Sequence, residues 1–142
     1  MPKILCIDDD NDILEGLKAI LENNGFETET ASNAKEGLDK AKKINPDLLI
    51  VDVMMDTDTD GFHLTYNIRK DDTLKYKPIL MLTSINQKTN FNFNPETDGE
   101  YLPVDKFIEK PVKPDKLIET IKNLLNLPKD KININGKITV MD

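Results

Sequence analysis

The sequence predicts an α/β domain built on a five-stranded, doubly wound parallel sheet. Short apolar runs, typical of buried strands, alternate along the chain with segments whose apolar residues recur at helical spacing. The strands are expected at residues 4–7, 26–30, 48–51, 79–82 and 107–109. The chain has 142 residues, which is enough for one such domain and too few for two.

Helices are expected between the strands and after the last one. In the first, the apolar residues of 13–21 share one face, and Gly25 supplies a left-handed stop. The second, residues 33–44, opens with a capping-box-like Asn-Ala-Lys-Glu and ends before Asn-Pro. The third covers residues 61–70. The last covers 114–125 and begins with a proline, which a first helical turn accepts.

Two segments depart from this alternation. Residues 86–104 are rich in turn-forming types where another helix would be expected, and they predict a long loop or a short displaced helix. Residues 1–127 are assigned to the domain and residues 128–142 to a C-terminal tail. The tail is typical of a β-hairpin around Asn135-Gly136.

The alternation within the tail predicts a hairpin with one apolar face. The residues on that face would be Ile132, Ile134, Ile138 and Val140. Because an isolated hairpin is marginal in water, we expect the tail to pack on the domain or on a second subunit, so a homodimer stays open.

Composition excludes several classes of partner. Acidic residues outnumber basic ones 26 to 19, the net charge is −7, and the lysines are dispersed, so binding to nucleic acid is not expected. No apolar run is long enough to span a bilayer, and the N-terminus does not resemble a signal peptide. The single cysteine, Cys6, lies in an apolar strand and is expected to be a buried thiol in a reducing compartment. We therefore expect a cytoplasmic protein without a membrane segment.

Reactive polar residues follow several of the expected strands. Asp8 and Asp9 follow the first, Asp52 the third, Thr83 the fourth and Lys110 the fifth. The carboxyl ends of parallel strands meet at one edge of a sheet, where open α/β sheets bind ligands. Clustered carboxylates favour a hard divalent cation such as Mg²⁺, and an aspartate can attack phosphorus to form an acyl phosphate. The pattern predicts a metal and phosphoryl site in which the lysine and the hydroxyl steady phosphoryl oxygens.

This ordered set strongly resembles the receiver domain of two-component response regulators over about residues 2–126. The matching motifs are Ile-Asp8-Asp9, the run from Pro46 through Asp52 to Met55, Thr83-Ser84 and Lys110-Pro111. The resemblance implies a flavodoxin-like fold. Because no output domain follows the last helix, it further implies a stand-alone receiver that signals by protein–protein contact and is not an enzyme, apart from slow autodephosphorylation.

The resemblance also implies roles for individual residues. Asp52 would accept a phosphoryl group from a sensor histidine kinase or a phosphotransfer protein. Asp9 would bind Mg²⁺ directly and Asp8 through water. Asp52 and the backbone carbonyl of Met54 would complete the protein ligands, and Mn²⁺ can substitute for Mg²⁺.

The remaining implied roles concern the switch. Thr83 would hydrogen-bond the phosphoryl group and Lys110 would pair with it. Phe107 matches the aromatic position that moves inward when Thr83 engages, and Lys110-Pro111 matches the family's cis peptide bond. The downstream partner is not identified by the sequence.

The sequence also departs from the family pattern and leaves alternatives open. Asp56 replaces the usual proline, and Asp60-Gly61 falls one position late, which predicts a longer acidic loop after Asp52. Residues 56–61 match the first half of a calcium loop, but Asn67 stands where a bidentate Glu is needed, so a second cation site stays open. His63 is expected to be a surface or packing residue, since no second ligand accompanies it.

Some of the acidic residues have plainer structural roles, and two other functions are compatible with parts of the pattern. Asp10 and Asp12 are expected to cap the first helix and complement its dipole rather than bind metal. An aspartate-nucleophile phosphatase of the haloacid dehalogenase type is suggested by Ile7-Asp8-Asp9-Asp10, but Asn11-Asp12 does not fit that family. The other rival is a phosphorylation-independent adaptor that retains the site.

Overall fold

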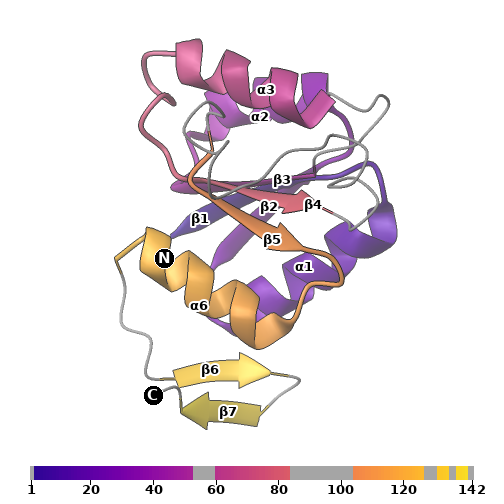
Figure 1. Ribbon diagram of the computed structural model, residues 1–142, viewed down its shortest axis with the longest axis vertical. Coiled ribbons are helices and arrows are strands. Elements are labelled where there is room, and N and C mark those ends of the chain that lie inside the picture. Colours follow the sequence, from indigo (N-terminus) through magenta and orange to yellow (C-terminus); the bar gives the residue numbers. More distant parts are fainter. Residues whose placement is uncertain (1, 53–59, 84–103, 127–130, 135–136, 141–142) are drawn as a thin grey trace.

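The computed structural model describes residues 2–52, 60–83, 104–126, 131–134 and 137–140. The predictions for Met54, for residues 56–59 of the acidic loop and for nearly all of the irregular segment 86–104 lie outside these residues. Within the described part, the chain forms a sheet covered by helices on both faces, with a small hairpin at the C-terminal end (Figure 1).

Five parallel strands form the central sheet, as the sequence predicts. They are β1 (Lys3–Ile7), β2 (Glu27–Ala31), β3 (Leu48–Asp52), β4 (Ile79–Thr83) and β5 (Lys106–Glu109). Their spatial order is β2-β1-β3-β4-β5, so the direction of winding reverses between β1 and β3. A doubly wound sheet binds ligands where its winding reverses, at the carboxyl ends of the strands.

Two pairs of helices cover the sheet. On one face lie α1 (Asn11–Asn23) and α6 (Pro114–Leu124), and on the other lie α2 (Ala34–Ile44) and α3 (Asp60–Lys70) (Figure 1). The three inner strands, β1, β3 and β4, are largely apolar because both of their faces are buried. In β1, Ile4 and Cys6 pack toward α1 and α6, while Leu5 and Ile7 pack in the opposite cluster. Among the described residues, no helix has the length and apolar character needed to cross a bilayer.

The caps place the starts of two helices. Asp10 Oδ1 accepts hydrogen bonds from the N–H groups of Asp12 and Ile13 at the start of α1. At α2, Asn33 accepts from the N–H of Glu36, but the Glu36 carboxylate returns to Ser32 and not to Asn33. In the predicted capping box, the hydrogen bond back to the Glu36 carboxylate therefore comes from the residue before the N-cap and not from the N-cap itself.

A clamp of polar side chains joins β4, β5 and α3 at the amino edge of the sheet. The Arg69 guanidinium donates to the carbonyls of Lys75 and Lys77 and to the carboxylate of Asp105. The same Asp105 oxygen accepts the N–H of Ile79, the first residue of β4, at 2.7 Å. The clamp fixes where β4 and β5 start, and so where they end.

The tail forms the predicted hairpin from β6 (Lys131–Ile134) and β7 (Lys137–Val140), and β6 lies beside α6 and α1. The register pairs Ile132 with Thr139, and Asn133 with Ile138. The prediction of one apolar face concerns side chains that lie outside the described part of the structure.

The close approach of α2 to β1 predicts a cost for enlarging Gly37. A Cβ at this position would lie 2.7 Å from Cδ1 and 3.0 Å from both γ-carbons of Ile7, a fully buried side chain. We expect Gly37→Ala to lower the free energy of unfolding by about 1–3 kcal/mol, measured by urea denaturation. The matched control is Gly16→Ala in α1, where a Cβ meets nothing within 4 Å and a gain of up to about 1 kcal/mol is expected. Equal stability of the two variants would contradict this packing.

Candidate functional site at the carboxyl edge of the sheet

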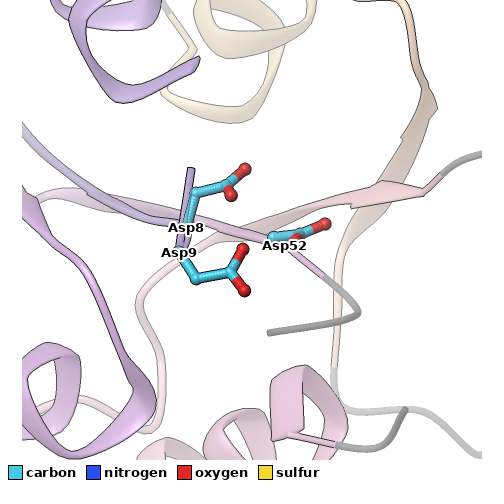
Figure 2. A group of neighbouring side chains, drawn as sticks. All are labelled: Asp8, Asp9 and Asp52. Carbon is cyan, nitrogen blue, oxygen red and sulfur yellow. The ribbon is translucent and has the colours of Figure 1, made fainter. Parts of the chain in front are cut away.

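Three carboxylates gather where β1 and β3 end. Asp8 and Asp9 follow β1 directly, and Asp52 is the last residue of β3. The two strands pair in register, with Ile7 opposite Val51, so their carboxyl ends coincide. One oxygen of each carboxylate lies within 4.8 Å of the others, and Figure 2 shows the three side chains turned toward a common space. Asp8 and Asp52 are buried, whereas Asp9 is exposed.

Lys110 directly follows β5, the strand at one edge of the sheet, and reaches these acids from there. Its Nζ lies 3.1 Å from Asp52 Oδ1 and 3.4 Å from Asp8 Oδ2. Its backbone N–H donates to the carbonyl of Thr83 at 2.6 Å, and the Lys110–Pro111 peptide bond is cis. One ammonium group thus lies between the acids of two strands.

The two buried acids are held differently. Asp8 Oδ1 accepts the N–H of Asp10 at 2.9 Å, and its Oδ2 accepts a long hydrogen bond from Lys110. Asp52 Oδ1 is buried and accepts no hydrogen bond from the described residues. Its contact with Lys110 is an ion pair by distance without hydrogen-bond geometry, so this oxygen keeps its lone pairs available to an incoming group.

Burial and mutual repulsion shift the pKa values of the site. Burial, with the charge of Asp8, raises the pKa of Asp52 to about 6, although Lys110 opposes the shift. Burial also raises the pKa of Asp8, against the effects of the Asp10 N–H and Lys110. Burial alone would lower the pKa of Lys110, but attraction to Asp52 and Asp8 outweighs it, and the pKa rises. One ammonium is insufficient to balance the carboxylates, so the site attracts further positive charge.

The donor set fits a hard divalent cation. Three carboxylates lie within reach of one ion, and one of their buried oxygens has no hydrogen-bond donor among the described residues. Oxygen ligands of this kind suit Mg²⁺, which keeps several waters and uses only a few carboxylates. Cys6 is not a competing ligand, because burial and the nearby Asp8 raise its pKa to about 12 and keep it a thiol.

The other predicted residues divide into those at the edge and those away from it. Thr83 is buried and ends β4, one position beyond the residue that pairs with Asp52. Phe107 is partly buried in β5, where it pairs with Met81 and packs against the apolar cluster under α2 and α3. His63 is exposed on α3. Sequence reasoning missed that the Asp10 N–H holds Asp8. The only signal for it was a third aspartate at the start of a helix.

A doubly wound parallel sheet that gathers aspartates, a threonine and a lysine at its carboxyl edge defines a receiver of two-component signalling. The chain belongs to the response regulator receiver domain family, whose model matches residues 4–122.

Similar proteins and structures agree with this assignment. The polar-differentiation response regulator DivK of Brucella anthropi is 29% identical over 126 residues, which are 88% of this chain and 98% of DivK. The transcriptional regulatory protein PhoP of Bacillus subtilis, for alkaline phosphatase synthesis, is 32% identical over 87% of this chain and 48% of its own length. The structure of the chemotaxis response regulator CheY4 of Vibrio cholerae superposes with a TM-score of 0.76 at 32% identity, covering 87% of this chain and 98% of CheY4.

The relatives differ in how much of their length is shared. The chain spans nearly all of DivK but only about half of several transcriptional regulators. The shared part is the receiver domain, a family that typically signals rather than catalyses.

The raised pKa of Asp52 predicts how the stability of the metal-free protein depends on pH. A carboxyl group that is harder to ionise in the folded state stabilises the fold below its unfolded pKa of 3.8, and this contribution is lost as the pH rises through about 6. At pH 7.5 in a chelator we expect Asp52→Asn to raise the free energy of unfolding by about 1–3 kcal/mol. The gain should disappear below pH 4.

The control for this prediction is Asp9→Asn, which removes a charge from the exposed member of the same cluster. It should change the stability less. Urea denaturation at several pH values measures both variants, and a loss of stability in Asp52→Asn at pH 7.5 would contradict the electrostatic account. Added Mg²⁺ should stabilise the wild type more than Asp52→Asn, because a ligand that binds only the folded state raises its stability.

Proposed function

We propose that the chain is a phosphorylation-switched signalling domain in which Asp52 accepts a phosphoryl group. The donor would be a phosphohistidine of a sensor histidine kinase or of a phosphotransfer protein, since receiver domains interact with such proteins. The observation that carries the proposal is the state of Asp52: a buried carboxylate at the end of β3 that shares one lysine with Asp8 and has an oxygen to which no described residue donates a hydrogen bond.

The transfer is a substitution at phosphorus. A carboxylate oxygen of Asp52 attacks, the new O–P bond forms as the P–N bond of the phosphohistidine breaks, and the bonding electron pair leaves with the imidazole. Asp8, Asp9, Asp52 and the carbonyl of Met54 would hold Mg²⁺, or Mn²⁺ in its place. When bound, the cation offsets the negative charge of the carboxylates and of the phosphoryl oxygens.

The residues of the chain then steady and report the new charge. The backbone N–H of Lys110 donates to the carbonyl of Thr83, which holds the main chain of Lys110 in place. The ammonium group can then turn from Asp52 Oδ1 to a phosphoryl oxygen without a change of main chain. The Thr83 hydroxyl would donate to a second phosphoryl oxygen. Phe107, which lies partly buried in the neighbouring strand, would move inward as Thr83 moves.

The output would be a protein–protein contact with a partner that the chain does not identify. The net charge of −7 disfavours nucleic acid as that partner. With a phosphohistidine donor, the reaction would take place in the cytoplasm.

Acetyl phosphate with Mg²⁺ tests the proposal against both rival functions. We expect wild type to gain one phosphoryl group, seen by intact-mass spectrometry, and Asp52→Asn to gain none because an amide is not a nucleophile. Continuous release of phosphate without a labelled protein would indicate a phosphatase. Neither label nor release would indicate an adaptor. Labelling of Asp52→Asn equal to wild type would overturn the assignment of the acceptor.

Lys110→Ala should separate phosphorylation from switching. In saturating Mg²⁺ we expect this variant to be labelled, more slowly, but to lose the amide chemical-shift changes at Thr83 and Phe107 that accompany phosphorylation of wild type. Lys113→Ala, an exposed lysine three residues away, is the matched control and should keep them. If Lys110→Ala shows the full wild-type shift changes in NMR spectra, its switching role is wrong.

A further inference from the structure

We infer that Asp10 is a positioning residue for the metal site, because its side chain fixes the backbone N–H that orients Asp8. This inference rests on the proposed function, since it concerns how the same site is held ready for its cation. Asp10 itself is exposed and does not belong to the group of three carboxylates.

Asp10 is bonded to the first turn of α1 through its side-chain carboxylate and through its backbone carbonyl. Its side-chain Oδ1 accepts the N–H of Asp12 at 2.9 Å and that of Ile13 at 3.4 Å. Its carbonyl oxygen accepts the N–H of Leu14 at 3.1 Å. Leu14 is buried against the sheet, so the residue is anchored to a helix that is itself fixed by packing.

The third polar group of Asp10 acts in the opposite direction. Its backbone N–H donates to Asp8 Oδ1 at 2.9 Å, while Lys110 lies 3.4 Å from the other oxygen. The shorter of these two contacts is therefore the one from Asp10. Asp8 is only 1% exposed, so water has little access to replace a lost donor.

Losing the cap would release the turn between Asp8 and α1. Without a side-chain acceptor at position 10, the backbone there keeps only the bond from the Leu14 N–H to its carbonyl, so the residue can rotate further and its own N–H need not point at Asp8. The Asp8 carboxylate would then turn toward Lys110 and away from the space it shares with Asp9 and Asp52. Outer partners of this kind orient metal ligands, and losing one typically weakens metal binding tenfold or more.

A purely electrostatic role makes a different prediction. Asp10 adds negative charge near the site, and Asp12, two residues further along the chain, does the same. Asn keeps the side-chain oxygen that caps the helix but lacks the charge, whereas Ala lacks both. Asp12→Asn removes a similar charge without removing the cap. These three changes separate positioning from charge.

The experiment measures the Mg²⁺ affinity of the full chain by isothermal titration calorimetry. We expect Asp10→Ala to weaken Mg²⁺ binding roughly tenfold. Asp10→Asn should stay close to Asp12→Asn, each within about twofold of wild type. Labelling by acetyl phosphate should show the same split: Asp10→Ala needs more Mg²⁺ for half-maximal rate but approaches the wild-type rate at saturation.

Each other outcome decides against the inference. Equal weakening in Asp10→Ala and Asp10→Asn would assign the effect to charge, and wild-type affinity in Asp10→Ala would show that the cap does not hold the site. Asp10→Gly keeps the test decisive if the alanine variant does not fold, because glycine is tolerated at an N-cap but offers no side-chain oxygen, and it should bind Mg²⁺ as weakly as alanine is expected to. Wild type that binds no Mg²⁺ would instead refute the proposed metal site itself.

Discussion

The repulsion among three carboxylates at the end of β1 and β3 is the constraint around which the site is arranged. Two of these carboxylates are buried, and the only ammonium at the site within the described residues is that of Lys110, which lies 3.1 Å and 3.4 Å from them. Removing carboxylates from water is costly unless charge and hydrogen bonds compensate. The fold supplies only part of that compensation, which is the physical basis for proposing a cation at this site.

The parts of the fold that look purely structural serve this arrangement. The register of β1 on β3 makes the strand ends coincide. The clamp of Arg69 and Asp105 sets the start of β4 and β5, and the bond from the Lys110 N–H to Thr83 sets their end. A slip of one residue in a parallel pair would move each side chain to the other face of the sheet. The site therefore depends on groups at the opposite edge as well as on its own residues.

The sequence was sufficient for the strands, the helices and the acidic cluster, for a physical reason. Buried strands and amphipathic helices leave a local periodicity, and the carboxyl ends of parallel strands must share an edge. Contacts between residues far apart in sequence leave no such trace. The Arg69–Asp105 clamp joins residues 36 positions apart and depends on backbone placement that no local pattern specifies.

Helix α1 links the site to the C-terminal extension. Asp10 caps the first turn of α1, and the buried face of α1 packs on the sheet. The match to the receiver family ends at residue 122, and β6, which comes later in the chain, lies beside both α1 and α6. These contacts differ in how much they contribute to the free energy of unfolding. Truncating one buried leucine of α1 would cost about 2–5 kcal/mol, whereas losing a cap costs about 1 kcal/mol. Leu14, Leu17 and Leu21 therefore set the position of the helix, and the cap only sets the direction of one N–H at its end. Because the leucines and the cap have these separate roles, the exposed side chain of Asp10 can control the geometry of the site although the stability of the fold depends little on it.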